Sequence, residues 1–211
     1  MQKLLLYTFF ILLVSFLSIG ASFGADWFVV KRVNDGDTVV LEDGRQVRYI
    51  GINAPEIAHA DQKAELYGNV AKEFNENLVL LKKIRLEFDE ERYDHYGRLL
   101  AYVYFQEGTF VNKTILEQGY AYCLHQKPNI KHDDVFIQAQ RSAMLAGKGI
   151  WHNWHEKETE YLGNRNSKRF HLKTCHFGEK ISKNNRIYFA SQWHAFWTGF
   201  SPCKKCIGKI K

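Results

Sequence analysis

The stretch VRYIGINAPE, Val47 to Glu56, begins as an apolar strand that carries one arginine, Arg48. It ends in a turn in which a proline stiffens the chain just before Glu56. The preceding runs, Trp27–Val33 and Asp37–Glu42, are also rich in β-branched and aromatic residues, and NDG and DG sequences separate the runs. Such sequences are typical of hairpins, so the pattern predicts three antiparallel strands, the third spanning Gln46–Ile52.

The sequence after this stretch alternates between helical and strand patterns. Residues 61–83 have an apolar spacing of four, four and three at Val70, Phe74, Leu78 and Leu81, which predicts an amphipathic helix. Two further strands, 83–89 and 97–105, and two helices, 111–119 and 132–149, follow. A 3 + 2 set of strands with a helix between the third and fourth predicts an α+β domain built on a five-stranded OB-type barrel with about three helices. We expect Trp151 to pack the end of the last helix onto this barrel.

The composition and the N-terminus indicate the partner class and the location. The chain has 211 residues, a net charge of +6 and a pI of about 9.0, which favours polyanions such as nucleic acid or anionic lipid. Residues 1–24 contain one cation, Lys3, then an uncharged apolar run, then small residues at Ser22 and Gly24. This pattern predicts a signal peptide cleaved after Gly24, and hence a secreted or periplasmic protein with a mature charge of +6 − 1 = +5.

A retained membrane anchor is the alternative interpretation of this segment. Its apolar run is short for a bilayer core of ~30 Å, which favours cleavage. We expect no membrane association after cleavage, no stable protein partner and a monomer.

Four charged residues fall at strand ends that a small barrel brings to one rim: Asp37, Arg48, Glu56 and Arg98. Two carboxylates suit a hard divalent cation or a positioned water, and two arginines suit phosphate oxygens. Phosphodiester hydrolysis needs this combination of a proton acceptor and fixed positive charge. Taken singly, each residue also fits an ordinary turn or a solvent-facing strand position.

From Trp27 to Trp151 the chain resembles the staphylococcal nuclease (thermonuclease) family. The matching pieces, in order along the chain, are DGDTV, VRYIGINAPE, YGNVAKEF, DHYGRLLAYVY, VNKTILEQGYA, KPN and GIW. The resemblance implies a calcium-dependent endonuclease on an OB barrel, which acts on DNA and RNA and leaves 3′-phosphate and 5′-hydroxyl ends.

The resemblance also implies roles for individual residues. It makes Arg48, Glu56 and Arg98 catalytic, with the arginines on the phosphate and Glu56 orienting or deprotonating water. Asp37 matches a carboxylate metal ligand, Ala54 offers its backbone carbonyl to the metal, and Tyr96 lies near the bound nucleotide. The family usually has an aspartate where this chain has Asn53, so we expect calcium to bind roughly ten- to hundredfold more weakly, or another divalent ion to serve. The alternative is that Asn53 only caps the turn.

The last fifty residues have a different composition, with His171-x3-Cys175 and Cys203-x2-Cys206 as their main feature. One histidine and three cysteines suit a closed tetrahedral zinc site, while an exported protein could instead form a disulfide between Cys175 and Cys203 or Cys206. The segment resembles the small metal-binding domain of the Ada DNA-repair protein. Because His171 replaces the cysteine that accepts methyl groups there, the resemblance implies structural zinc rather than methyl transfer.

The sequence therefore predicts a signal peptide at 1–24, a nuclease domain at 25–152, a linker at 153–161 and a metal-binding module at 162–211. Lysines and arginines of the module, Arg169, Lys204 and Lys205 among them, fit either phosphate contacts or a solvated basic face. The predicted function is hydrolysis of DNA, RNA or both. The alternative is a nucleic-acid-binding module with weak or no catalysis, which the loss of charge at Asn53 favours.

Overall fold

The computed structural model describes residues 26–58, 63–155 and 159–207. The predicted signal peptide lies outside these ranges. Within them, no helix has the length and apolar character that a bilayer crossing requires.

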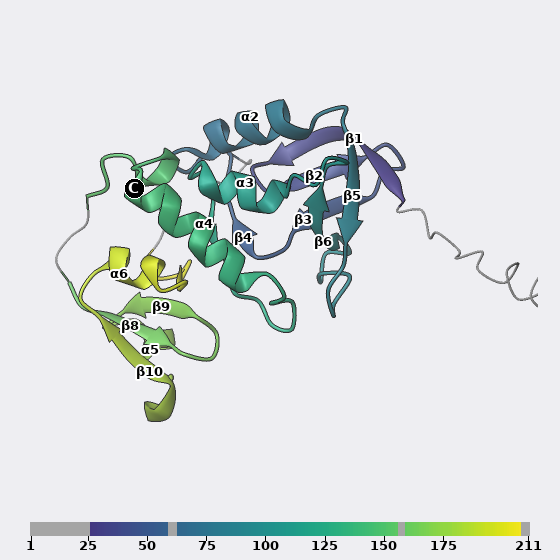
Figure 1. The fold of residues 1–211 in the computed structure, drawn as a ribbon. Helices are drawn as coiled ribbons and strands as arrows, with labels where there is room; N and C mark the ends of the chain where they lie inside the picture. The colour runs from purple at the N-terminus through teal and green to yellow at the C-terminus, as the bar shows by residue number, and fades with distance from the viewer. Residues whose placement is uncertain (1–25, 59–62, 156–158, 208–211) are drawn as a thin grey trace, which may run out of the picture.

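A closed barrel in the strand order β1-β2-β3-β6-β5 forms the first half of the molecule (Figure 1). Its strands are β1 (Trp27–Asp35), β2 (Thr38–Leu41), β3 (Gln46–Tyr49), β5 (Lys83–Glu87) and β6 (Leu99–Tyr104). All neighbours are antiparallel except β3 and β6, which run parallel, and the β1–β5 pairing closes the ring. The predicted five-stranded barrel is thereby confirmed.

Three helices accompany the barrel: α2 (Gly68–Val79), α3 (Val111–Glu117) and α4 (Asp133–Leu145). Gly119 follows α3 with φ of 72°, a left-handed conformation that favours glycine, and its Cα faces the Lys148 carbonyl too closely for a side chain.

The predicted helix at 61–83 is wrong at both ends: residues 61–62 lie outside the described ranges, but residues 63–67 are not helical and α2 begins only at Gly68. Helix α2 ends at Val79, and Leu81 lies beyond it, 73% exposed. The buried face contains Asn75, which donates to the Asp35 carbonyl at 3.0 Å and pairs with the Tyr49 hydroxyl at 3.2 Å. The spacing of apolar residues cannot predict a buried helix face whose central residue, here Asn75, is polar.

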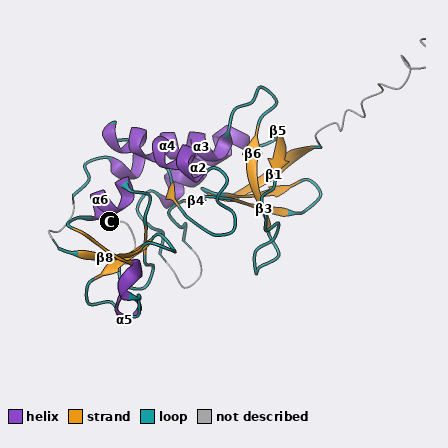
Figure 2. Ribbon diagram, turned by 60° about the horizontal axis from the view of Figure 1, so that its bottom comes forward, coloured by secondary structure: helices purple, strands orange, loops and turns teal. Residues whose placement is uncertain are grey.

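The tail folds as a second, smaller unit around a four-stranded sheet in the order β10-β8-β9-β11. Its elements are β8 (Tyr161–Asn164), β9 (Arg169–Leu172), α5 (His176–Glu179), β10 (Arg186–Phe189), α6 (Gln192–Trp197) and β11 (Ser201–Pro202), with a 3-10 turn at Lys183–Asn185. Another 3-10 turn, Gly149–Trp151, ends the first unit after α4. In both views the tail sheet lies at one end of the molecule and the barrel at the other, with α4 and β4 (Ile52–Asn53) between them (Figures 1 and 2).

Trp151 does not pack on the barrel core as expected. It belongs to a second core with Phe196 and the tail aromatics, and its ring lies 5.1 Å from that of Phe196 and 5.4 Å from that of Trp154. This core also includes Tyr122 of β7 (Tyr122–Cys123) and Met144 of α4. The tail therefore buries its apolar side chains against the first unit rather than only against itself.

Gln140, on α4, links the two units through hydrogen bonds. Its side chain accepts from the Cys123 backbone N–H at 2.7 Å and donates to the Phe196 carbonyl, and the residue is fully buried. Because buried polar groups need partners, these bonds select one arrangement of α4, β7 and α6. The tail is thus held in a defined position beside the barrel.

Candidate active site

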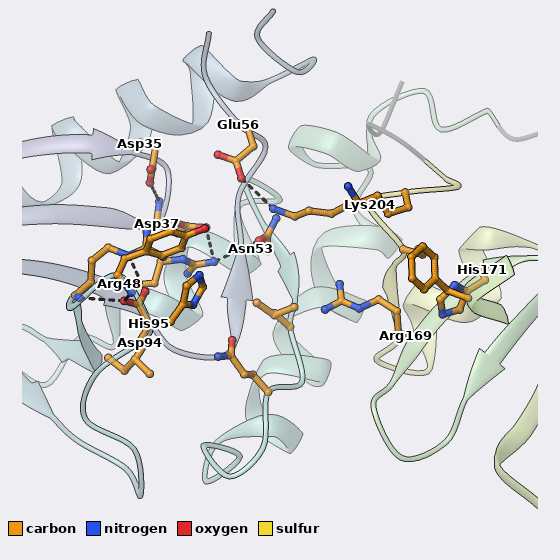
Figure 3. A pocket seen from close by; sticks show the side chains of 18 residues that line it. Asp35, Asp37, Arg48, Asn53, Glu56, Asp94, His95, Arg169, His171 and Lys204 are labelled. Carbon is orange, nitrogen blue, oxygen red and sulfur yellow. Dashed lines mark hydrogen bonds and ion pairs between the residues drawn. The ribbon is translucent and has the colours of Figure 1, made fainter. Parts of the chain in front are cut away.

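A cavity of about 720 Å³ lies where the barrel rim meets the tail (Figure 3). The four charged residues singled out in the sequence, Asp37, Arg48, Glu56 and Arg98, all line it. Cations of the tail, Arg169, Lys204 and Lys205, line its other side. A volume of this size is typical of sites that enclose a whole small ligand.

Strand register brings Asp37 and Arg48 together. Arg48 pairs with Thr38 across β2 and β3, and its Nη2 lies 3.0 Å from Asp37 Oδ2 in a nearly buried ion pair. The Ala54 N–H donates to the same Asp37 oxygen at 2.7 Å. Burial raises the pKa of Asp37 to about 6, although the guanidinium of Arg48 opposes this rise.

Asn53 joins this cluster from β4. Its Oδ1 accepts from Arg48 Nη2 at 3.3 Å, while its amide nitrogen donates to the Ala54 carbonyl and to the Tyr122 hydroxyl. The side-chain oxygens of Asp37 and Asn53 therefore face the same cationic nitrogen. Asn53 also bonds within its own turn through the Ala54 carbonyl, which is the kind of contact that the turn-capping interpretation requires.

Arg98 reaches the cavity from the turn before β6. Its Nε donates to Asp94 Oδ2 at 2.7 Å, and Asp94 Oδ1 accepts the backbone N–H groups of Tyr96 and Arg98. Gly97, with φ of 78°, supplies the left-handed residue of this turn. Although burial acts in the opposite direction, the side-chain and backbone hydrogen bonds from Arg98 lower the pKa of Asp94, which keeps it ionised.

Glu56 faces the cavity and meets the tail. Its Oε1 lies 3.1 Å from the Lys204 ammonium, across the cavity from the barrel (Figure 3). The Glu56 carbonyl accepts from the Glu65 N–H at 2.8 Å, and the Glu65 side chain accepts from the Glu56 N–H at 3.2 Å. These two bonds hold the backbone of the turn that presents Glu56.

Tyr96 lies at the mouth of the cavity and is 73% exposed. Its ring centre lies 3.7 Å from that of His95 and 5.3 Å from the Arg98 guanidinium. An exposed aromatic beside an arginine suits a nucleotide base, but its position alone does not test that role.

The predicted tail ligands come together. Among the described residues, the metal-binding atoms of His171, Cys175, Cys203 and Cys206 form the one compact group of three or more His, Cys, Asp or Glu side chains, all within 4.8 Å of one another. All four cysteines of the chain are free thiols, so the alternative disulfide is not formed in this structure. Within the described ranges the carboxylates at the barrel rim make no such group, and a metal there needs amide and carbonyl oxygens as well.

The pKa shifts in the tail cluster differ between ligands: the pKa values of His171 and Cys175 are lowered, whereas burial raises the pKa of Cys206 to about 12. Burial, followed by the charge of Arg169, lowers the pKa of His171, which favours the neutral imidazole that binds metals. Burial acts to raise the pKa of Cys175, but hydrogen bonds from Cys206 and from the backbone N–H groups of Gly178 and Phe177 lower it below the usual value. A thiol with a lowered pKa is the form that supplies a thiolate ligand.

Three functional contacts escaped the sequence reasoning. Asp94 orients Arg98, and its signal was the Asp-x-x-Gly turn just before that arginine. Asp35 lines the cavity and accepts the Asp37 N–H at 2.9 Å, whereas the sequence pattern around it indicates only a hairpin. The third, the contact of Lys204 with Glu56, had no local signal because it joins residues 148 positions apart.

Comparison with known proteins agrees with this geometry. The family model described as "Staphylococcal nuclease homologue" matches residues 46–153. The chain is 36% identical to the thermonuclease of Staphylococcus hyicus over 129 residues, which is 60% of this chain and 76% of that protein. It is 37% identical to the endonuclease YncB of Bacillus subtilis over 141 residues, which is 64% of each chain. It is also 39% identical to the prophage-derived endonuclease YokF of the same organism, over 58% of this chain and 43% of that protein.

The matched region contains β3, the turn to Glu56, the turn to Arg98 and helices α2 to α4, which are the elements that build the cavity rim. It covers half of the chain, and a curated relative is covered over three quarters of its length. The chain therefore belongs to the staphylococcal nuclease homologues and is an enzyme of the nuclease type, a phosphodiester hydrolase.

Proposed function

We propose that the chain is an exported, metal-dependent endonuclease that hydrolyses phosphodiester bonds within DNA, RNA or both. The observation that carries this proposal is the convergence of Asp37, Arg48, Glu56 and Arg98 on one cavity. Two of these side chains accept protons or bind cations, and two carry permanent positive charge. Together they supply what phosphodiester hydrolysis needs.

In the proposed mechanism, Arg48 and Arg98 bind the scissile phosphate. Arg98 is held by Asp94 through Nε, so its planar fork of terminal nitrogens remains for an anion. The fixed charge stabilises the phosphate oxygens as negative charge grows on them in the transition state. Because Asp94 and the barrel orient the guanidinium groups in advance, little reorganisation is needed during the reaction.

Glu56 receives the proton of the attacking water. Its side chain is 33% exposed and lines the cavity, so a water can reach it. The Lys204 ammonium pairs with the carboxylate, which is the form that accepts a proton. The Ala-Pro turn and the Glu65 bonds limit the positions that this carboxylate can adopt.

The rim residues fit a hard divalent cation such as calcium. The oxygens of Asp37 and Asn53 already face one cationic group, the Arg48 nitrogen, and the Ala54 carbonyl lies next to them. Oxygen donors of this kind suit calcium: Asp37 and Asn53 would bind it directly, Ala54 through its carbonyl and Glu56 through a water. When bound, the ion would supply positive charge to the phosphate oxygens.

The tail is proposed to bind one zinc ion through His171, Cys175, Cys203 and Cys206. Its support is the compact ligand group, the free thiols and the lowered pKa of Cys175. The sequence resemblance to the Ada-type metal-binding domain supports a zinc site in which His171 replaces one cysteine. Residues 1–24 are proposed to direct export and to be cleaved, and the mature enzyme is proposed to act outside the cytoplasm, as a monomer without a membrane anchor.

A plasmid-nicking assay tests the function. The mature chain, incubated with EDTA, then with calcium and then with manganese, is expected to nick plasmid only with a metal. Binding without cleavage under every metal would instead select the alternative, a nucleic-acid-binding module, which the missing charge at Asn53 favours.

A further inference from the structure

The cavity has two walls that come from different parts of the chain. The barrel rim provides the proposed catalytic residues, and the tail provides Arg169, Phe177, Lys204 and Lys205. Figure 3 shows Lys204 and Arg169 pointing from the tail toward the barrel residues. Hydrolysis at Glu56 as proposed above needs no contact of these four side chains with the substrate, so the tail wall calls for a separate explanation.

The tail cations are held on a fixed backbone. Arg169 lies on β9, pairs with Ser201 of β11 and donates to the Pro202 carbonyl at 3.1 Å. Lys204 and Lys205 lie on the turn that follows, whose Cys203 N–H donates to the Phe170 carbonyl at 2.8 Å. The turn is closed by the Cys206 N–H, which donates to the Cys203 carbonyl. Three cations thus project from one rigid edge of the tail.

The two walls touch at the Lys204–Glu56 pair, and this contact can be exchanged for another. Lys204 is 59% exposed, and an ion pair between exposed groups contributes little because water and salt screen it. A phosphate group can therefore take the Lys204 ammonium from Glu56 when a polyanion enters the cavity. A polyanion bound at this position therefore contacts both the barrel wall and the tail wall.

Each wall also presents one exposed aromatic ring. Tyr96 projects from the barrel side, and Phe177, 52% exposed, projects from the tail side. A basic groove with aromatic rings on which bases stack is the pattern by which proteins bind single-stranded nucleic acid. A duplex keeps its bases stacked inside and cannot offer them to either ring.

Resting on the proposed function, we propose that Arg169, Lys204 and Lys205 of the tail form a second phosphate subsite, which binds a phosphate next to the scissile one. Phe177 stacks a base of the same strand. The strand lies between the two walls, with its scissile phosphate on Arg48 and Arg98 and its neighbouring phosphate on the tail.

The test uses the triple variant Arg169→Gln, Lys204→Gln, Lys205→Gln in the mature chain. Two substrates are compared: a single-stranded 12-mer and bis(p-nitrophenyl) phosphate, which has one phosphate. We expect the ratio of kcat/KM for the single strand to that for the small diester to fall at least tenfold in the variant.

Salt dependence of binding gives a second readout. Each phosphate neutralised on a single strand contributes about 0.7 to the slope of log K against log salt, so losing the one tail phosphate contact should lower the slope by about 0.7. Binding is measured by fluorescence anisotropy in the Glu56→Gln background, in which the strand stays intact. Lys180→Gln serves as the matched control, because Lys180 is an exposed lysine of the same tail that does not line the cavity. It should change neither the ratio nor the slope.

Phe177→Ala provides an independent variant if the triple variant does not fold. It should weaken single-strand binding about fivefold or more without changing the salt slope, because stacking releases no counterions. An unchanged substrate ratio and salt slope in the folded triple variant would overturn the subsite. If the wild type cleaves nothing with any metal but the slope still falls in the triple variant, the nuclease proposal fails while the subsite stands.

Discussion

At the scale of single residues, Glu56 and Arg98 are the proposed catalytic residues best suited to a test, because each faces the cavity and each is oriented by a neighbour. Glu56 lies on a turn stiffened by Pro55, and Arg98 is held by Asp94. Asp37 and Arg48 differ from them, since they form a nearly buried ion pair whose loss would also disturb folding. The cleanest tests of catalysis are therefore at positions 56 and 98.

Glu56→Gln and Arg98→Ala should each lower kcat on single-stranded DNA at least ~100-fold, the scale of losing a general base or a transition-state charge. Both side chains are partly exposed, so the thermal unfolding midpoint should change little. Initial rates at saturating calcium, with the midpoint as control, check this. Near-normal turnover in either variant would remove the role assigned to that residue.

Asn53→Asp should tighten calcium binding by roughly ten- to hundredfold, because a carboxylate adds a charge to the oxygen donors around Asp37. Asn53 donates to the Tyr122 hydroxyl, and that hydroxyl can reverse its bond and donate to a carboxylate instead. Isothermal titration calorimetry measures the affinity, and Tyr122→Phe separates the loss of this bond from the gain of charge. Equal calcium affinities of the wild type and the Asn53→Asp variant would mean that position 53 does not bind the metal.

At the scale of elements, the turns between strands do as much for the site as the strands themselves. The Asp94–Arg98 turn fixes one arginine, and the register of β2 against β3 places Arg48 beside Asp37. Strand β4 pairs with β7 and thereby brings Asn53 to the rim. Each charged group thus reaches the cavity from the end of a hydrogen-bonded element, where its backbone is fixed.

Asp94→Asn should lower kcat about tenfold, less than Arg98→Ala, because the amide still accepts the turn's backbone N–H groups but no longer pairs with the guanidinium by charge. KM for the single strand should rise less than kcat falls, since Lys204 and Arg169 still hold the strand. Steady-state kinetics separate the two effects, and Asp94→Glu should restore part of kcat. A lowered unfolding midpoint with unchanged kcat would show that Asp94 acts only on the turn.

At the scale of the whole molecule, the tail packs against the first unit and also presents cations to the cavity. Its aromatic core continues into Tyr122, Met144 and Trp151 of the first unit, and Gln140 joins the two by hydrogen bonds. The same tail sets Lys204 and Lys205 between two of its proposed zinc ligands, Cys203 and Cys206. The proposed metal site and the proposed phosphate subsite therefore share one short turn, so we expect metal binding and substrate binding to be coupled.

Removing zinc should reduce the preference for the single-stranded 12-mer over bis(p-nitrophenyl) phosphate at least about fivefold. The reason is that the turn carrying Lys204 and Lys205 loses the metal ion to which its two cysteines are proposed to bind. The experiment uses a chelator selective for zinc over calcium, in millimolar calcium, with elemental analysis before and after treatment. Cys206→Ser should behave like the chelated chain, and adding zinc back to the chelated wild type should restore the preference. One zinc per chain is expected before treatment, and a Cys175–Cys203 disulfide detected by mass spectrometry would contradict the metal site.

Much of the barrel and its order of elements can be predicted from the sequence, because strand alternation and turn residues are local signals. The same signals failed at Leu81, where the helix had ended, and at Asn75, a buried polar residue. They failed again at Trp151, whose partners lie in the tail. In each case the deciding contact was made by residues distant along the chain.

The sequence by itself determined the five-stranded barrel, the positions of the charged residues at its strand ends and the four metal-ligand residues of the tail. Periodicity, turn chemistry and ligand spacing act over a few residues, and they can be recognised without a fold. Only the tertiary structure decided that the tail lies against the catalytic rim, with Lys204 on Glu56. That placement depends on a shared aromatic core and on buried hydrogen bonds between segments that no local pattern connects.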